Sequence, residues 1–249
     1  MTYARTPVAP DRVGRTAMEE WFGALTASHL PIAFADADAT RPRIAFAAPL
    51  AAAAAGEREL VDLYLVERLP IWRIRSALEP LLPAGHRWLS AEDVWPGEPP
   101  LPGQVVFADW RVIVTWSSDS GLTPGDLGRA AARVLAAPAI PLTRSKGGVE
   151  KEVDLRPFLD RIELVEPETP ERRPRDTVAI DLRLAVDPER GAGRPDEVVA
   201  AIAEAAGTAF QILELTRRGL VLAAETGLPS RPVRATPPSA ATRRPRRAD

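Results

Sequence analysis

One order of elements occurs twice in the second half of the chain, and it limits the available folds more than any other feature. A strand pattern, a loop, a helix begun by proline and a second strand occupy residues 105–143. The same order returns at 177–215, with Pro124 and Pro195 in equivalent places. Two such units joined strand to strand give the order β-α-β-β-α-β, which is that of a ferredoxin-like arrangement.

The elements of this repeat are supported by local signals. TVAIDLRLAV (177–186) alternates apolar and polar residues, as a half-buried strand does, and VVFADWRVIVTW (105–116) places its apolar residues with the same period. Thr123 and Asp126 stand in the T-x-x-D spacing of a capping box, which satisfies backbone N–H groups at a helix start. These signals predict strands that flank a capped helix.

The first half has the same order if the stub TYAR (2–5) supplies its first strand. Thr16 and Glu19 form a second capping-box pattern at the start of the first helix. Helical and alternating periodicity predict the remaining elements. These are helices at 16–28, 71–82, 124–137 and 195–206, and strands at 43–47, 60–66, 86–94, 105–116, 139–143, 161–166, 177–186 and 210–215, with a further edge at 220–225.

The expected fold class is therefore α+β, with two tandem ferredoxin-like (βαββαβ) modules, the first with a degenerate N-terminal strand. PGEPPLPG (96–103) holds four prolines in eight residues, which predicts a linker rather than a helix or central strand. The predicted organisation is an N-terminal module at 1–95, this Pro-rich linker, a C-terminal module at 104–228 and a disordered basic tail at 229–249.

Composition excludes several classes of protein. The chain has no cysteine, so it has no disulfide, thiolate metal site or iron–sulfur ligand of its own. The N-terminus lacks the apolar core of a secretory signal, and no apolar run approaches the roughly 20 residues of a membrane span. We expect a cytoplasmic protein without membrane contact. The segment from Arg231 carries about +5, which leaves about −7 on the preceding 230 residues, so the body does not resemble a nonspecific nucleic-acid binder.

The sequence offers little sign of catalysis. His29 and His86 are the two histidines, and neither has a metal-ligand partner at i+3 or i+4. Adjacent acids such as Glu92 and Asp93 are typical of a solvated surface. We therefore predict no catalytic residues and no metal site. An enzyme with its own site would need a deep pocket with a shifted carboxyl near Arg156 or His86.

The stretch TRSKGGVEKEVDLRPFL (143–159) is the strongest candidate for a binding site. Gly147-Gly148 predicts a hairpin turn that lifts basic residues to its tip, where they could contact phosphate. The alternative is a polar surface hairpin, because acids offset the positive charge. The candidate contacts to a ligand or RNA are Arg144, Lys146, Lys151, Asp154 and Arg156, with Arg243, Arg244, Arg246 and Arg247 of the tail adding charge.

Six phrases in order resemble the radical SAM-associated (radical SAM-linked) protein family, a bacterial domain of unknown function. The resemblance spans nearly all of residues 2–222. The phrases are HLPIAF (29–34), RPRIAFAAPL (41–50), ERELVDLYLVE (57–67), LLPAGHRWLSAEDV (81–94), RSKGGVEKEVDLRPFLDRIEL (144–164) and GRPDEVVAAI (193–202). Basic and polar positions of the family pattern are reduced in the first half, whereas the second-half phrases remain.

The resemblance implies a partner rather than a reaction. A radical SAM protein would carry the iron–sulfur cluster and S-adenosylmethionine, and this chain would hold no cofactor. The first hypothesis is a noncatalytic accessory protein that positions an RNA-type substrate for that enzyme. The alternative is a protein–protein adaptor that docks the radical SAM partner through an exposed sheet edge or the linker beside Trp95, without nucleic acid contact.

Overall fold

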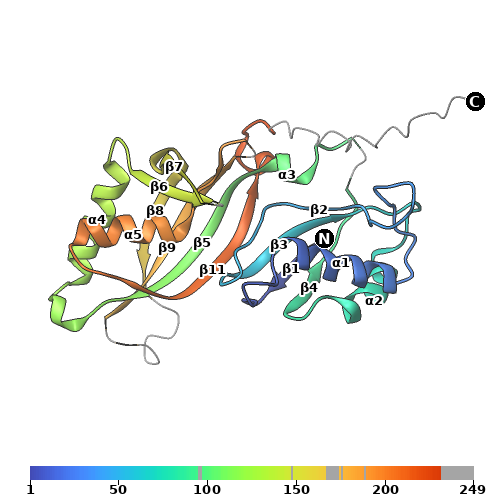
Figure 1. The fold of residues 1–249 in the computed structure, drawn as a ribbon, viewed down its shortest axis with the longest axis horizontal. Coiled ribbons are helices and arrows are strands. Elements are labelled where there is room, and N and C mark those ends of the chain that lie inside the picture. Colours follow the sequence, from blue (N-terminus) through green and yellow to red (C-terminus); the bar gives the residue numbers. More distant parts are fainter. Residues whose placement is uncertain (95–96, 147, 167–173, 175, 188, 231–249) are drawn as a thin grey trace, which may run out of the picture.

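The computed structural model describes residues 1–94, 97–146, 148–166, 174, 176–187 and 189–230, and these form an α+β protein (Figure 1). Nine of its strands form one mixed sheet and two form a separate hairpin. The strands are β1 (Thr2–Arg5), β2 (Ile44–Phe46), β3 (Ala55–Leu63), β4 (His86–Ser90), β5 (Val105–Thr115), β6 (Pro141–Lys146), β7 (Val149–Asp154), β8 (Leu159–Val165), β9 (Thr177–Asp187), β10 (Gly191–Ala192) and β11 (Gln211–Leu222). The helices are α1 (Arg15–Ala27), α2 (Ile71–Leu78), α3 (Leu101–Gln104), α4 (Pro124–Ala136), α5 (Pro195–Ala206) and α6 (Ala223–Thr226), with short 3₁₀ turns η1 (Glu79–Leu81), η2 (Ser118–Ser120) and η3 (Arg156–Phe158).

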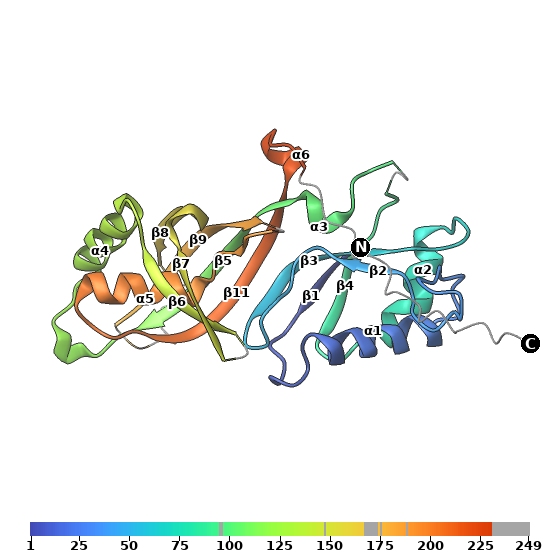
Figure 2. The same ribbon diagram turned by 45° about the horizontal axis from the view of Figure 1, so that its top comes forward.

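The C-terminal half is a four-stranded antiparallel array in the order β8-β9-β5-β11. Period-two alternation directs one side of β5 and β9 toward the helices, because successive side chains of a strand point to opposite faces. Val112 of β5 and Ile180 of β9 pack there with Leu127 of α4 and Ile202 of α5 in the main core cluster. The two helices therefore cover one face of this half (Figures 1 and 2).

The N-terminal half repeats the pattern with strands in the order β2-β3-β1-β4. The stub Thr2–Arg5 does form β1, between β3 and β4. Trp21 of α1 lies in the core, with its ring 5.3 Å from that of Tyr3 and 5.5 Å from that of Phe46. Apolar residues of the helix face and of the strands thus close this half around Trp21.

The two halves share one sheet because β11 pairs in parallel with β3. The pairing is short, with Thr216 opposite Ala55 and Arg217 opposite Gly56. At this joint the Arg217 guanidinium is buried and forms an ion pair with the Glu59 carboxylate. The joint is therefore polar, although it lies in the interior.

Several sequence predictions were wrong at the level of elements. The Pro-rich segment contains α3, and Leu101 is buried there, because proline is tolerated in the first turn of a helix. The first helix begins after Gly14, which has φ 60°, and no side chain caps it, so the predicted Thr16 capping box does not form. Asp126 does form its predicted box with Thr123.

Three predicted strands also differ from the structure. Residues 139–143 lead into the β6–β7 hairpin, outside the main sheet, and β8 occupies the place that the repeat assigned to them. The predicted strand 210–215 and edge 220–225 are one long strand, β11, followed by α6. Continuous pairing with β5 explains the length of β11.

Within the described residues, no helix combines the length and the apolar character needed to cross a bilayer.

Candidate functional site

The predicted basic tip is the hairpin β6–β7, and its two faces differ in charge. Arg144 pairs with Lys151 on the same face as Leu142 and Val153, which pack against the main core. The opposite face is exposed. It carries Thr143, Ser145, Glu150 and Glu152. This face of the hairpin is therefore acidic.

Arg144 is engaged in an internal ion pair. Its Nε and Nη2 atoms donate to the Glu197 carboxylate at 2.8 and 2.7 Å, and Nη2 also donates to the Ala192 carbonyl at 3.2 Å. Both side chains of the pair are only 14% exposed. A bidentate contact of this kind fixes geometry as well as charge. Arg144 thus holds the hairpin against the first turn of α5.

Asp154 and Arg156 close the turn that follows the hairpin. Asp154 accepts hydrogen bonds from the backbone N–H groups of Ile140 at 2.8 Å and Arg156 at 3.0 Å, and these bonds hold the pKa of Asp154 below its ordinary value. The Arg156 guanidinium donates to the Leu159 carbonyl at 2.7 Å. Both residues therefore have an architectural role in this fold.

The two second-half phrases of the sequence meet at this point. A Cβ added at Gly193 would lie 3.0 Å from the Phe158 Cβ and 3.1 Å from the Leu184 Cβ, so a larger residue would push the segments apart. The Arg144 guanidinium lies 5.7 Å from the centre of the Phe158 ring. The packing of Gly193 against Phe158 and the ion pair between Arg144 and Glu197 thus explain why these two segments lie side by side.

Of the remaining candidates, Lys151 is exposed on β7. Lys146 ends β6, but its side chain lies outside the described residues. So do Gly147, Trp95 and the tail arginines Arg243, Arg244, Arg246 and Arg247. The structure thus engages Arg144, Asp154 and Arg156 in separate contacts within the fold, with Glu197, with backbone N–H groups and with the Leu159 carbonyl respectively.

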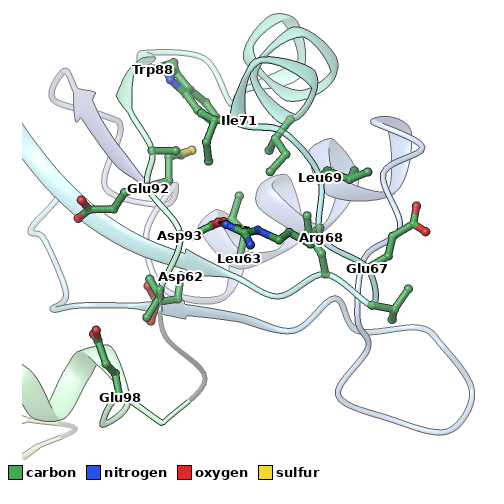
Figure 3. Close-up of a pocket in the computed structure, with 16 residues that line it drawn as sticks. Asp62, Leu63, Glu67, Arg68, Leu69, Ile71, Trp88, Glu92, Asp93 and Glu98 are labelled. Carbon is green, nitrogen blue, oxygen red and sulfur yellow. Dashed lines mark hydrogen bonds and ion pairs between the residues drawn. The ribbon is translucent and has the colours of Figure 1, made fainter.

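A cavity of about 720 Å³ opens in the N-terminal half (Figure 3). It lies between the end of β3, the start of α2 and the segment after β4. Its apolar lining includes Leu63, Leu69, Ile71, Ile74 and Trp88. Its charged lining comprises Asp62, Glu67, Glu92, Asp93 and Glu98, against Arg68 and Met1. A lining that is partly apolar and mostly acidic suits a lysine or arginine side chain, whose aliphatic part can cover apolar surface while its charged end meets a carboxylate.

The charges of the cavity are not equivalent. Arg68 and Asp93 form an exposed ion pair, with Nε and Nη2 at 2.9 and 2.6 Å from the carboxylate. Burial raises the pKa of Asp62, the amino terminus opposes that rise, and Glu98 adds to it. Figure 3 shows the side chains of Asp62 and Glu98 on the same side of the cavity. This side carries unbalanced negative charge.

The two histidines do not form a catalytic or metal-binding group with other side chains among the described residues. His86 is half-buried, with its ring stacked 5.4 Å from that of Tyr3 and edge-on to Trp21, and burial lowers the pKa of its imidazole. His29 lies exposed just after α1. Among the residues that the structure describes, no group of three or more His, Cys, Asp or Glu could hold a metal ion. The histidines therefore have structural or surface positions.

Sequence reasoning missed the cavity. Glu92 and Asp93 looked like a solvated acidic pair, yet Glu92 lines the cavity and Asp93 pairs with Arg68. The available signal was the spacing of acids just beyond two predicted strands, 60–66 and 86–94. That signal is weak without knowledge that the ends of β3 and β4 lie near each other.

Comparison with known proteins gives a family but no function. None of the curated proteins compared with the sequence matches it. One solved structure with some likeness is the crystal structure of the archaeal box H/ACA sRNP Nop10-Cbf5 complex, at 12% identity and a TM-score of 0.40, covering 87% of this chain. The match covers 46% of that other chain, so this chain spans less than half its length. The sequence pattern of one family matches residues 17–195, and the chain accordingly belongs to DUF2344, described as an uncharacterized protein conserved in bacteria.

Proposed function

We propose that this protein is a noncatalytic accessory protein of a radical SAM enzyme, and that it works as an adaptor that binds a basic segment of that enzyme. The observation that carries the proposal is the cavity of the N-terminal half, which is lined by five carboxylates, one arginine side chain and several apolar residues. The link to a radical SAM enzyme comes from the six sequence phrases. The iron–sulfur cluster and S-adenosylmethionine would belong to the partner, since this chain has no cysteine.

The adaptor function is favoured over the positioning of RNA for electrostatic reasons. Nucleic acid affinity depends largely on cations that contact phosphates. Here the exposed face of the hairpin carries Glu150 and Glu152, and the Arg144 guanidinium is already paired with Glu197. An acidic cavity repels phosphate but attracts the side chains of arginine and lysine.

The strand orders support a finer description of the fold, which we also propose. The orders β2-β3-β1-β4 and β8-β9-β5-β11, each with two crossover helices, are those of two ferredoxin-like modules, and the β6–β7 hairpin is an insertion in the second. Native-state hydrogen exchange on the whole chain would test this description. A single opening free energy for residues 2–90 and 105–222 would argue against two modules.

Co-purification tests the adaptor function. The full-length protein is purified from its host with nuclease treatment, and captured proteins are identified by mass spectrometry. We expect a radical SAM protein to be retained, and to be lost when Asp62→Asn and Glu92→Gln remove two of the five carboxylates that line the cavity. The matched control, Glu150→Gln with Glu152→Gln, removes the same charge from the hairpin and should leave capture unchanged.

Two outcomes would refute the adaptor function. Capture that disappears with nuclease and survives the cavity variant would favour an RNA-mediated role. Capture that is lost equally in the cavity variant and the hairpin control would show that only the total charge matters.

A further inference from the structure

We infer that the cavity of the N-terminal half binds the arginine-rich C-terminal segment of the same chain, residues 231–249, which thereby competes with the basic segment of the partner. This inference concerns the regulation of the docking site proposed above and rests on that function. It is drawn from the shape and charge of the cavity, and from the composition and length of the segment.

The spacing of the carboxylates in the cavity suits a ligand with several separated cations. Five carboxylates line it, yet within the described part of the chain no three acidic or histidine side chains stand close enough to hold one metal ion. A single compact cation could therefore satisfy only part of the charge. An arginine-rich segment could place one guanidinium near Asp62 and Glu98 and another near Glu67.

The apolar lining of the cavity adds a second requirement. Leu63, Leu69, Ile71, Ile74 and Trp88 supply the apolar part of the lining. The long stem of an arginine side chain can cover such a surface while its guanidinium reaches an acid. Glu150 and Glu152 on the hairpin offer negative charge on an exposed face without a comparable cavity. The cavity is thus the better match for arginine.

The C-terminal segment has the complementary composition. It contains six arginines and a single acid, Asp249, and four of the arginines lie within TRRPRR (242–247). Val233 and several prolines supply apolar surface between the charges. The charge of about +5 on this segment is opposite in sign to that of the cavity lining, where five carboxylates outnumber Arg68 and the amino terminus.

The segment also starts close enough to reach the cavity. The described chain continues to Ser230, just after α6, and Ala223 of α6 packs with Val106 at the start of β5. Figures 1 and 2 show α6 beside α3, whose first residue is three positions after the cavity residue Glu98. Twelve residues separate Ser230 from the first arginine of TRRPRR, and a stretch of that length can span at most roughly 40 Å. A compact chain of 249 residues has a radius of gyration of about 18 Å, so this span is roughly twice that radius.

Covalent connection makes even a weak contact effective. A segment on a short tether has an effective concentration on the order of 1 mM. If the segment binds with a dissociation constant of about 0.1 mM in trans, the tethered copy would weaken a competing basic peptide about tenfold. The partner would then need a tighter basic segment, or several contacts, to displace it.

The test measures this competition in the full-length protein. The probe is a fluorescent peptide with the sequence of residues 231–249, and its binding is followed by anisotropy. In the tail variant, serine replaces the four arginines of TRRPRR, and we expect it to bind the probe about tenfold more tightly than wild type. When Asp62→Asn and Glu92→Gln are added to the tail variant, we expect binding of the probe to be lost. Adding Glu150→Gln and Glu152→Gln instead should leave binding of the probe unchanged.

A second measurement locates the segment directly. Because the chain has no cysteine, Ala248→Cys gives a single site for a nitroxide label. We expect broadening of the amide signals of Leu65, Val66 and Val94 around the cavity, and none at Val149 on the hairpin. High salt should remove the broadening. Labelled chains mixed with isotope-enriched unlabelled chains report binding between copies.

The outcomes separate the two proposals. Equal probe affinity for wild type and the tail variant, with binding still dependent on Asp62 and Glu92, would overturn the tail inference and leave the docking site intact. Broadening that occurs only between mixed chains would also overturn it. The docking function itself would be refuted if Asp62→Asn with Glu92→Gln changed neither the binding of the probe nor the capture of the partner.

Discussion

The buried ion pair between Arg217 and Glu59 offers the sharpest test of how this fold is held together. Each side chain is only 2% exposed. The Arg217 Nε atom donates to Glu59 at 2.8 Å, Nη2 contacts the second carboxylate oxygen, and the guanidinium also donates to the carbonyls of Pro49 at 2.8 Å and Ala48 at 3.1 Å. The pair lies where β11 meets β3, so it joins the two halves of the sheet.

Removing one partner should cost much of the stability of the protein. Glu59→Leu leaves a buried guanidinium without its counter-ion, and Arg217→Met leaves a buried carboxylate, and each such loss costs about 3–5 kcal/mol. Domains are stable by only about 5–15 kcal/mol in total. At roughly 2–4 °C per kcal/mol, each variant should lower the melting temperature by about 6–20 °C.

The double variant shows whether the cost comes from the orphaned charge. With both charges removed, the remaining loss comes mainly from the carbonyls of residues 48 and 49, which lose their donor at about 1–3 kcal/mol. Urea unfolding followed by circular dichroism measures all three variants. The double variant should lose less than the two single variants combined, by at least about 2 kcal/mol.

A matched control is the exposed pair Arg15–Glu19, whose side chains are 93% and 58% exposed. Arg15→Met should change stability by less than about 0.5 kcal/mol. The reasoning fails if Glu59→Leu stays within about 1 kcal/mol of wild type, or if the losses of the two single variants simply add.

Three other predictions follow from single contacts. Thr123→Ala removes the capping box with Asp126 and should cost about 1 kcal/mol in urea unfolding, whereas Thr123→Ser should cost little. Arg144→Met leaves Glu197 without its partner and should cost about 2 kcal/mol locally, seen as roughly thirtyfold faster amide exchange in the β6–β7 hairpin; unchanged exchange would show that this ion pair does not hold the hairpin in place. Burial lowers the pKa of His86 below 6.5, so stability should be complete above about pH 6.5 and fall as the pH drops toward the folded-state pKa; thermal melts of His86→Phe should lose this pH dependence.

The sequence predicted the elements whose cause is local. Alternation in 105–116 and 177–186 identified β5 and β9, since both strands bury one face under helices. Pro124 with the Thr123 box identified the start of α4, and Pro195 that of α5. These signals depend on neighbouring residues alone, so they can be recognised in the sequence without knowledge of the tertiary structure.

The features that depend on distant partners were not predicted. Arg217 lies in the charged run TRR and has the local appearance of a surface residue, yet its partner Glu59 is 158 positions away. The same holds for Arg144, which looked like part of an exposed tip until α5 supplied Glu197 at a separation of 53 residues. Alternation alone could assign Arg144 to one face of the hairpin, but not decide which face meets the core.

The polar joint bears on how an adaptor could work. A buried ion pair is seldom the most stable filling for an interior, because apolar residues of similar volume avoid the desolvation cost. Gly56 leaves room for the pair, since a Cβ there would lie 2.6 Å from the Glu59 Cγ. Directional bonds from Arg217 to Glu59 and to the carbonyls of residues 48 and 49 fix how β11 meets β3, and hence how the cavity of one half is oriented relative to the other half. We therefore expect the double variant, Glu59→Leu with Arg217→Met, to lose partner capture by more than its loss of stability explains; full capture would show that orientation at the joint is irrelevant to docking.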